Sequence, residues 1–530
     1  MNQLDMSTPE GITLGLLPEI LLTGWSLIVL LVASWRHETP ADSRLAGWLS
    51  FAGVVLSSAG LGWLWINDVG PLGLAQMIAL DPFRYAGLSL VLLSAGATIL
   101  LSLGYLERER LLAPEYYPLI LLATSGMMFL AGAEDLIVLF LGLEVMSVAV
   151  YVLAGYNRAN PSSAEAALKY FLIGAFASGF LLYGIALIYG ATGTTNLSLI
   201  GAQLAGGELS LMAALGLGLL LIGFGFKVAA VPFHMWAPDV YDGSPTPVTG
   251  FMATGVKIAA FVALVRVLVE SFPSAVTVWQ PVIFWLAVAS MVVGNLVALS
   301  QRTLKRMLAY SSIAHAGYLL AAVWPGTRMG AGAVLLYLAA YTLTTLASFG
   351  FLAALGRGGE REVTNDDIAG LAGRRPWMAL GLFVCMLSLL GFPGTLGFIG
   401  KWNILTAVIA EGQVALAVVL VVTSVISAGY YLPVIMAMYM KPAASEESHG
   451  NVRLWPAAAG AIAVSVIAVL LFGVWPARML DAAGRSASTL TQTSGAGSRE
   501  SGATGRGREV VGPERYQPLT PDPRLQPYKP

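Results

Sequence analysis

The sequence predicts an all-α membrane protein that crosses the bilayer about fourteen times, because only helices can span a bilayer without a closed barrel. Its composition is the first indication: 57% of the 530 residues are hydrophobic, 11% are charged, and the mean hydropathy is +0.74. The second is that apolar runs of about 20 residues, enough to cross a hydrocarbon core of about 30 Å, recur from end to end. The third is that four of the seven lysines lie inside those runs: Lys169, Lys227, Lys257 and Lys401.

The expected spans follow from the lengths of the apolar runs and from the interruptions between them. They cover residues 15–35, 46–66, 84–105, 116–132, 135–155, 164–190, 211–231, 245–269, 279–299, 304–324, 331–355, 377–410, 414–438 and 456–476. The first ten residues carry two acids and no Lys or Arg, so they do not form the basic start of a signal peptide, and we expect the first helix to be retained.

The composition changes after the last expected span. Residues 477–530 are rich in Gly, Ser, Thr and Pro and show no apolar period. We therefore expect a transmembrane domain over residues 1–476 and a polar, disordered tail over residues 477–530.

Positive charges in the loops predict the orientation of the helices. The loops after odd-numbered spans carry Arg36, Arg44, Arg108, Arg110, Arg158, Arg302, Lys305, Arg306, Arg357, Arg361, Arg374, Arg375, Lys441 and Arg453. The loops after even-numbered spans hold little beyond Arg84 and Arg328. The positive-inside rule then places the odd-numbered loops in the cytoplasm and the N-terminus in the periplasm.

Two of the expected spans contain helix breakers beside a lysine. In the seventh span Lys227 is followed by Pro232, and in the twelfth span Gly391 and Pro393 precede Lys401. Broken helices are tolerated at membrane depth where their free backbone groups are buried in protein or face a wet cavity, as in transporters built from inverted repeats. Because the two breaks lie five spans apart, we expect an inverted repeat that relates spans 4–8 to spans 9–13.

Charges inside the spans are candidates for an ion path. A charge at the bilayer centre costs roughly 2.5 to 3.5 kcal/mol on an insertion scale, so such groups usually face a hydrated interior and handle ions. Glu144 and Lys169 lie in neighbouring spans and are expected to pair, so that a small change in their separation would move a proton. Lys227 and Lys401 stand at the breaks, and Lys257 lies too deep in its span to reach the headgroups.

Structural alternatives exist for several polar residues. Lys169 stands near the end of its span and could extend to the headgroups. His234 follows the break, where a proton relay and a structural hydrogen bond fit equally well, whereas packing or a hydrogen bond with neighbouring hydroxyls is favoured for His315.

Other polar residues are assigned structural roles from the sequence. Asp239 and Asp242 are expected to form a turn and cap a helix, and Glu134 and Asp135 to cap the outer end of the fifth span. The single cysteine, Cys385, is expected to fill the core and excludes a disulfide within the chain or a cysteine-based metal site.

Five stretches of the sequence carry a resemblance to a known family. They are FLGLEVMSVAVYVL, EAALKYFLIGAFASGFLLYG, FKVAAVPFHMWAPDVYDGSPTPV, LKRMLAYSSIAHAGY and GFPGTLGFIGKW. Through them, residues 12–476 resemble the antiporter-like membrane subunits of respiratory complex I, the NADH-quinone oxidoreductase. The lysine at position 401, where the M subunits are expected to carry glutamate, favours the N subunits, and so does the lack of an apolar segment after the last span, where the L subunits carry a lateral helix.

The resemblance implies a translocase subunit that pumps protons while its partners transfer electrons from NADH to a quinone. It implies fourteen helices, breaks in helices 7 and 12, and proton transport across the bacterial inner membrane along a chain of residues. That chain consists of Glu144, Lys169, Lys227, Lys257 and Lys401, with His234 beside it.

The resemblance also indicates which cofactors and partner subunits to expect. The sequence contains no dinucleotide fingerprint, flavin site or iron–sulfur ligand set, so NADH, FMN, the clusters and the quinone are expected in partner subunits. The expected partners are the other membrane subunits of complex I, further antiporter-like subunits among them, and membrane lipid. A net charge of -1 offers no basic surface for nucleic acid.

Two other functions fit the same pattern. A subunit of a multi-component cation/proton antiporter would share the fold and the buried charges, and its genomic neighbours would encode antiporter partners. A structural scaffold would use its lysines only in interhelical salt bridges, and neutral substitutions would then alter assembly without altering proton transfer.

Overall fold

Helices make up nearly all of the chain that the computed structural model describes, which is residues 2–5, 8–35, 39–67, 69–71, 77–112, 114–207, 209–356, 363–442 and 455–490. Two short parallel strands, β1 (Asn2–Leu4) and β2 (Val69–Pro71), form a small sheet. Most of the predicted tail, residues 491–530, lies outside the described residues, as do the loop arginines Arg36, Arg357, Arg361 and Arg453.

The first half of the bundle consists of long apolar helices that match the predicted spans. They are α2 (Leu17–Ser34), α3 (Pro40–Ile66), α4 (Pro82–Arg108), α5 (Tyr116–Gly132), α6 (Leu136–Ala154), α7 (Pro161–Thr192), α9 (Leu211–Lys227) with α10 (Ala237–Gly243), and a continuous run of α11 (Thr246–Phe251), η1 (Met252–Val256), α12 (Lys257–Arg266) and η2 (Val267–Ser271). In that run η1 and η2 are π-helical turns.

The second half of the bundle also consists of long apolar helices, one of them broken. It contains α13 (Val276–Ala298), α14 (Leu304–Val323), α15 (Arg328–Leu355), α17 (Pro376–Leu390) with α18 (Leu396–Ala410), α19 (Val414–Met440) and α20 (Pro456–Val474). Short helices lie at the ends of the spans: α1 (Pro9–Gly15), α8 (Leu197–Leu204), the 3-10 turn η3 (Pro273–Ala275), α16 (Leu371–Arg374) and α21 (Ala477–Ala487).

The predicted number of crossings is confirmed. Ten helices among the described residues are long and apolar enough to cross a membrane alone. The shorter helices α5 and α9, the helix α14 and the pair α17–α18 bring the number of crossings to the predicted fourteen. The chain is therefore a multi-pass, all-α membrane protein.

Capping residues followed by proline explain where several helices begin. Thr39 caps α3, Asp81 caps α4 and Asn160 caps α7, each through its side-chain oxygen, and each is followed by proline at the first helical position. Asp135 caps α6 through the N–H of Ile137, as predicted for the fifth span. The sequence therefore encodes these helix starts locally.

Both predicted breaks are present. The helix α9 ends at Lys227 and α10 begins at Ala237, while α17 ends at Leu390 and α18 begins at Leu396. Gly391, which ends α17, has a φ of 88°, a left-handed conformation that glycine adopts without the steric penalty of a side chain.

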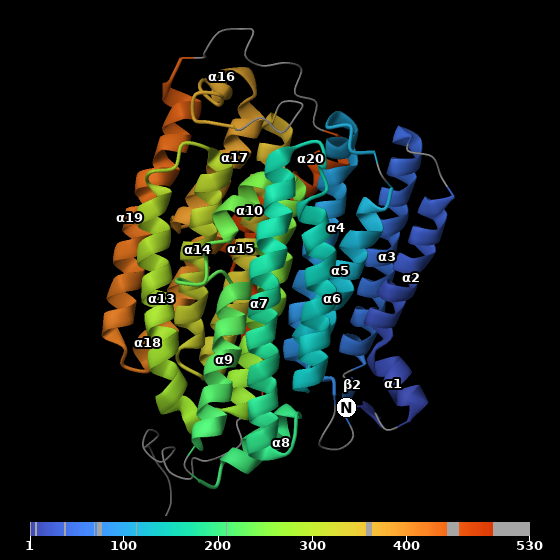
Figure 1. Ribbon diagram of the computed structural model, residues 1–530. Helices are drawn as coiled ribbons and strands as arrows, with labels where there is room; N and C mark the ends of the chain where they lie inside the picture. The colour runs from blue at the N-terminus through green and yellow to red at the C-terminus, as the bar shows by residue number, and fades with distance from the viewer. Residues whose placement is uncertain are drawn as a thin grey trace, which may run out of the picture. The chain divides into compact units, whose positions relative to one another are not determined.

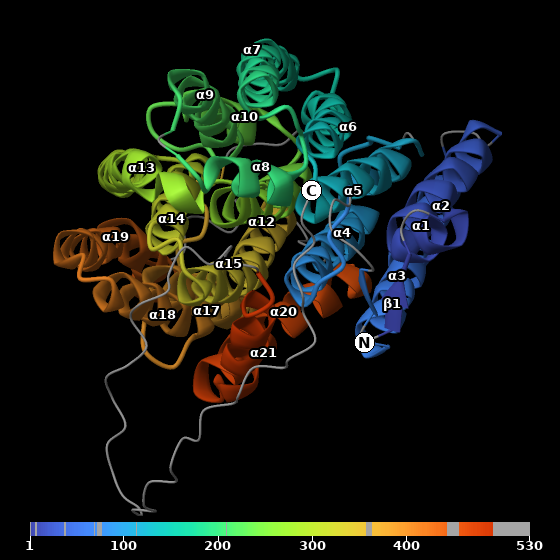
Figure 2. The same cartoon turned by 90° about the horizontal axis from the view of Figure 1, so that it is seen from below.

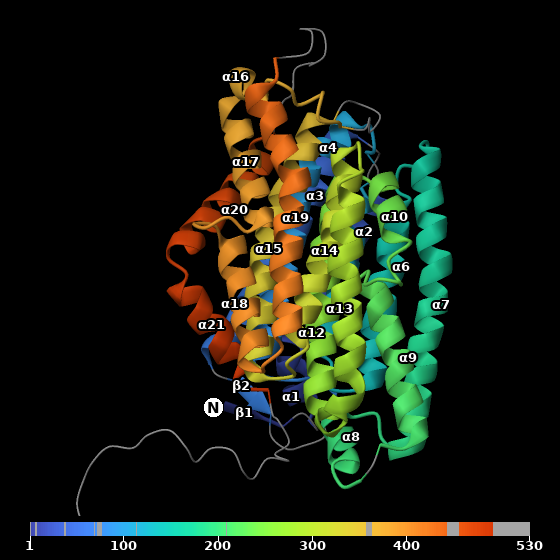
Figure 3. The same cartoon turned by 90° about the vertical axis from the view of Figure 1, so that its left-hand side faces the viewer.

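The two broken helices run in opposite directions. Figure 1 shows α10 above α9 but α17 above α18, and Figure 3 gives the same order from another side. Each break falls in the fourth span of its set of five, which agrees with the predicted inverted repeat. Below, the end of the bundle that carries α16, uppermost in Figure 1, is called the α16 end, and the opposite end the α8 end.

The interior of the bundle is built around the run from α11 to η2 and around α15. Every residue of Thr246–Ser271 is buried within the chain, and α15 is buried along almost its whole length. Figure 2 shows α12 and α15 in the interior, with α2, α7, α13 and α19 toward the outside. Polar side chains on α12 and on the helices around it are therefore shielded from lipid.

Helical structure continues beyond residue 476, where the sequence predicts the start of the tail. The chain continues as α21, which packs against α15 and α4. Ala483, Ala487 and Leu490 are buried and recur at helical spacing, and Arg328 Nε donates to the carbonyl oxygen of Leu490 at 3.3 Å. This apolar face consists of alanines and one leucine, so its signal in the sequence is weak compared with that of the apolar spans.

Candidate functional site

Lys227 is held by hydroxyl groups and aromatic rings at the break after α9. Its side chain is buried, and Nζ donates to Ser147 Oγ at 2.7 Å and to the Tyr151 hydroxyl at 3.4 Å, both on α6. The same nitrogen lies 5.4 Å from the ring centre of Tyr151 and 5.7 Å from that of Tyr170. No carboxylate of the described residues lies within ion-pair distance of Lys227, so its immediate partners are neutral.

Glu144 lies on the same face of α6 as Ser147 and Tyr151, one helical turn before Ser147. Its side chain is partly buried, and among the described residues its Oε1 has no hydrogen-bond partner. Ser147, one turn further along this face, accepts a hydrogen bond from Lys227. Glu144 is therefore placed to influence Lys227.

Lys169 is not paired with Glu144 in this structure, although the sequence predicted that pair. Lys169 Nζ lies 2.6 Å from Glu165 Oε1 and 2.9 Å from Asp239 Oδ2. Glu165 stands one turn earlier on α7, and the break before α10 brings Asp239 beside that turn. These two carboxylates occupy Lys169 in place of Glu144.

Asp239 connects three helices toward the α16 end of the bundle. Besides Lys169 of α7, it accepts a hydrogen bond from Arg306 Nη1 of α14 at 2.9 Å, and Asp242 lies 3.8 Å from the same nitrogen. The Lys169 side chain is 40% exposed in the isolated chain. The sequence assigned Asp239 to a turn and did not indicate these ion pairs.

Lys257 begins α12, directly after the π-helical turn η1. Its Nζ donates to the backbone carbonyl and to the Oγ of Ser312 on α14. Ser312 Oγ also accepts a hydrogen bond from the Tyr341 hydroxyl of α15 at 2.8 Å. Lys257 is buried, and among the described residues it forms no ion pair.

His315 lies one turn beyond Ser312 on α14 and is buried. Its Nδ1 is 2.6 Å from the Tyr337 hydroxyl of α15, and its Nε2 is 3.2 Å from the Tyr431 hydroxyl of α19. The prediction of hydrogen bonds with hydroxyl groups is confirmed. Because both ring nitrogens are bonded, the imidazole connects two hydroxyl groups through opposite edges.

Lys401 uses the carbonyl groups that the second break sets free. Its Nζ donates to the carbonyl oxygens of Leu389 at 3.1 Å and Leu390 at 3.0 Å, at the end of α17. It also lies 4.6 Å from the ring centre of Tyr318, which is one turn beyond His315 on α14. The break thus supplies neutral acceptors for a buried ammonium group.

One face of α14 therefore connects Lys257 to Lys401. Ser312, His315 and Tyr318 follow one another at intervals of three residues, which places them along one side of a helix. Polar residues at this spacing inside an apolar span are a signal that sequence reasoning could have used for His315.

His234 lies in the segment between α9 and α10, apart from that face of α14. Its side chain is partly buried, and its Nδ1 has no hydrogen-bond partner among the described residues. Its place beside the ion path stays a prediction.

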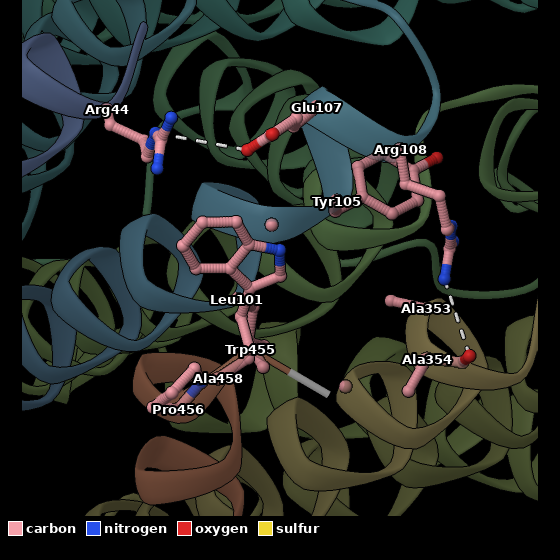
Figure 4. A pocket seen from close by; sticks show the side chains of 12 residues that line it. Arg44, Leu101, Tyr105, Glu107, Arg108, Ala353, Ala354, Trp455, Pro456 and Ala458 are labelled. Atoms are coloured by element: carbon pink, nitrogen blue, oxygen red, sulfur yellow. Dashed lines mark hydrogen bonds and ion pairs between the residues drawn. The ribbon is translucent and has the colours of Figure 1, made fainter. Parts of the chain in front are cut away.

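A cavity of about 630 Å³ lies between α4, α15 and α20, away from the buried lysines. Figure 4 shows Arg44 facing Glu107 on one side of it, Arg108 pointing toward Ala354 on the other, and Trp455 between them. None of the four lysines lines this cavity. Elsewhere among the described residues, no group of three or more His, Cys, Asp or Glu side chains has the geometry of a metal site.

Fourteen crossings, two oppositely directed broken helices and a buried lysine at each break define an antiporter-like membrane subunit. A family model described as "NADH:quinone oxidoreductase/Mrp antiporter, TM" matches residues 133–427, which contain both broken helices.

Two relatives indicate to which of the two classes named by this family model the chain belongs. The NADH-quinone oxidoreductase subunit N of Gemmatimonas aurantiaca is 44% identical over 502 residues, which cover 92% of this chain and 96% of the relative. The subunit N of Trichlorobacter lovleyi is 43% identical over 471 residues, or 88% of this chain and 95% of the relative. The chain belongs to the NADH-quinone oxidoreductase subunit N family.

Solved structures share the fold. A chain of the respiratory complex I from Thermus thermophilus with bound aureothin is 37% identical, with a TM-score of 0.75, and the alignment covers 88% of this chain and 99% of that one. A chain of the Mrp complex from Dietzia sp. has a TM-score of 0.77 at 24% identity, covering 89% of this chain and 97% of that one. At that identity the second likeness shows the fold alone.

Proposed function

We propose that this chain is the proton-translocating membrane subunit of an NADH-quinone oxidoreductase, in which electron transfer from NADH to a quinone drives proton export. The observation that carries the proposal is that Lys227, Lys257 and Lys401 are buried and have only neutral hydrogen-bond partners. A buried lysine with no carboxylate beside it gives up and regains a proton more readily than a paired one. Such groups are suited to passing protons.

The proposed assembly follows from the family. The chain joins the other membrane subunits of complex I, further antiporter-like subunits among them, in the lipid of a bacterial inner membrane. NADH, FMN, the iron–sulfur clusters and the quinone are bound by partner subunits. The N-terminus and the α8 end then face the periplasm, and the α16 end faces the cytoplasm.

The proposed route runs from Lys227 through water to Lys257, and then along α14 to Lys401. On the second part of the route, Ser312, His315 and the hydroxyl groups bonded to them are the intermediate donors and acceptors. An imidazole bonded through both nitrogens can take up a proton on one edge and release one from the other. The route to Lys401 therefore needs no carboxylate.

The proposed coupling begins at Lys169. While Asp239 and Glu165 hold Lys169, Glu144 has no cation beside it and stands one turn from Ser147, which binds Lys227, so a charge on Glu144 would act on that lysine. A change in a neighbouring subunit that releases Lys169 toward Glu144 would weaken that influence and let Lys227 pass on its proton. In this proposal Asp239 competes with Glu144 for Lys169, whereas the sequence indicated Glu144 and Lys169 alone.

A cation/proton antiporter subunit is the second candidate, because the matching family model covers both classes. The relatives that are 44% and 43% identical to this chain are named as NADH-quinone oxidoreductase subunits, which favours the first candidate. Genomic neighbours that encode quinone-reducing partners would support the first candidate, and antiporter partners would support the second.

The experiment is NADH-driven proton pumping in inverted membrane vesicles that carry Lys227→Ala, with assembly of the complex measured in parallel. We expect the complex to assemble and to lose pumping. The matched control is Lys441→Ala, because Lys441 lies at the end of α19 and pairs with Asp366 at 3.2 Å while 53% of its side chain is exposed. Normal pumping in an assembled Lys227→Ala complex would overturn the proposal.

A further inference from the structure

A second group of buried charges lies at the α8 end, apart from the buried lysines. Arg266, the last residue of α12, is surrounded by three carboxyl groups: Nη1 lies 2.8 Å from Asp81, 2.9 Å from Glu270 and 3.4 Å from Glu134. The Arg266 and Glu270 side chains are 2% and 4% exposed, and those of Asp81 and Glu134 are 19% and 12% exposed. We call these four residues the Arg266 cluster.

The Arg266 cluster has more acids than bases. Three carboxylates around one guanidinium would carry a net charge of minus two if all were ionised. The neighbouring Arg84 also attracts Asp81, but its guanidinium is 2.6 Å from Glu19 in a fully buried pair, so it brings its own counter-charge. Buried like charges around a single cation repel one another strongly, so at least one carboxyl group in the cluster holds a proton.

Other acids nearby add to this excess. Asp135, next to Glu134, is buried and accepts hydrogen bonds from the Thr195 hydroxyl and from the N–H of Ile137. Neither donor carries a charge. Apart from Arg84, the surroundings that the structure describes therefore supply no further cation that would let all three carboxyl groups of the cluster ionise.

Asp81 is the carboxyl group that stays ionised. Burial by itself would raise the pKa of Asp81, but the charge and hydrogen bond of Arg266, together with the N–H of Arg84, outweigh burial and hold that pKa below its usual value. The proton therefore belongs to one of the two glutamates.

Glu134 and Glu270 are placed to share that proton. Both lie against the same nitrogen of Arg266, Glu270 at 2.9 Å and Glu134 at 3.4 Å, so their carboxyl groups are neighbours, and one proton between them would relieve their mutual repulsion. Glu270 Oε2 accepts no N–H or O–H from any other group among the described residues, whereas Glu134 Oε1 accepts the Ser198 hydroxyl of α8 at 2.8 Å. A shared proton gives the buried Glu270 oxygen its missing partner.

We infer that the pair Glu134–Glu270 holds an exchangeable proton and is the station through which protons pass between the subunit and the aqueous phase at the α8 end. This inference rests on the proposed proton-pumping function and extends it to a site outside the lysines. A proton suits the site better than a metal cation does, because a metal cation would stand against the Arg266 guanidinium.

The helix α12 connects this station to the buried lysines. Lys257 is its first residue and Arg266 its last, so the two ends lie about 13 Å apart at 1.5 Å per residue. Each end adjoins a π-helical turn, a feature that often occurs at functional sites. A small movement of this fully buried helix would act on Lys257 and on the Arg266 cluster together.

The test is Glu270→Gln in the assembled complex, because glutamine keeps the shape of the side chain and a hydrogen-bond donor but cannot exchange a proton. We expect NADH-driven pumping in inverted vesicles to lose most of its rate. The infrared spectrum of the purified complex should also lose the pH-dependent carbonyl stretch of one protonated carboxyl group. Glu270→Asp keeps a titratable group and should restore part of both signals.

Asp481→Asn is the matched control, since Asp481 is an exposed carboxylate on α21. If Glu270→Gln prevents assembly, Glu134→Gln takes its place, and loss of pumping together with the infrared band supports the inference in the same way. Unchanged pumping overturns it, whether or not the band is lost. A sodium dependence of pumping that the variant abolishes also overturns it, because it would assign the site to a metal cation.

Lys227→Ala, measured alongside, separates the two proposals. If Lys227→Ala stops pumping while Glu270→Gln leaves it normal, the inference about the Arg266 cluster fails and the proposed function stands. If both variants pump normally in assembled complexes, the proposed function itself fails.

Discussion

The buried arginines and the buried lysines of this protein differ in the partners that stabilise them inside the bundle. Arg84 and Arg266 lie against carboxylates, at 2.6 Å from Glu19 and at 2.8 Å from Asp81. Lys227, Lys257 and Lys401 bind only hydroxyl groups, carbonyl groups and aromatic rings. Arginine stays protonated in proteins and therefore needs a counter-ion when buried, whereas lysine can lose its proton and so tolerate neutral partners.

The two kinds of cation also occupy different depths. Arg84 bonds to the end of α1, and Arg266 adjoins η2, which packs against α8, so both lie toward the α8 end. The helix α10, which carries Asp239, lies toward the α16 end. The lysines with neutral partners lie at the two breaks and at the start of α12. Ion pairs thus stand toward both ends, and buried lysines with neutral partners stand between them, an arrangement that suits the proposed proton path.

Glu19→Ala tests the paired region and should have the largest effect on stability. It leaves the fully buried Arg84 without a counter-ion, and removing one partner of a buried ion pair typically costs about 3 to 5 kcal/mol. The measurement is the thermal midpoint of the purified complex together with the amount of this subunit that it retains. Glu10→Ala, at an exposed position of α1, is the control. An unchanged midpoint for Glu19→Ala would show that buried arginines need no counter-ion here.

Lys257→Met tests the unpaired region and should change stability much less. Methionine loses the two hydrogen bonds to Ser312 but also removes the cost of burying a cation, so we expect a net change within about 1 kcal/mol. Pumping should nevertheless be lost. The thermal midpoint and NADH-driven pumping, measured on the same preparation, check both parts. A fall in stability as large as that of Glu19→Ala would remove the distinction between the two kinds of cation.

A comparison of two histidines tests which of them serves the path. His315→Gln should slow pumping clearly, because glutamine cannot exchange protons between the hydroxyl groups of Tyr337 and Tyr431. His234→Gln should slow it less, because the Nδ1 of His234 bonds to none of the described residues. The measurement is the pumping rate of each variant relative to its NADH oxidation rate. A larger loss in His234→Gln would favour the placement expected from the sequence.

The sequence predicted the spans and breaks well because their causes are local. The apolar length marks each crossing, and Pro232 and Gly391 mark the two breaks, beside which Lys227 and Lys401 lie. A residue that interrupts a helix acts on its own neighbours in the chain, so no knowledge of the tertiary structure was needed.

Partners distant in the chain could not be predicted in the same way. Asp239 is 70 residues from Lys169, and only the packing of α10 against α7 shows that Asp239 competes with Glu144 for that lysine, whereas Glu165 lies one helical turn before it. The Arg266 cluster was missed although Arg266, like the lysines, is a charge inside an apolar run. Its significance depends on three carboxyl groups from three separate segments, which meet only in the folded chain.

Asp239→Asn should have the smallest effect on stability, because it tests ion pairs that are partly exposed and not buried. The ion pairs of Asp239 with Lys169 and Arg306 are roughly one-third exposed, so water and salt screen them, unlike the pair of Arg84 with Glu19. We expect a small decrease in the thermal midpoint at low salt that disappears at high salt. Pumping should change more than stability, because Glu165 alone then holds Lys169 away from Glu144. A salt-independent loss comparable to that of Glu19→Ala would instead place Asp239 among the fixed, buried counter-ions.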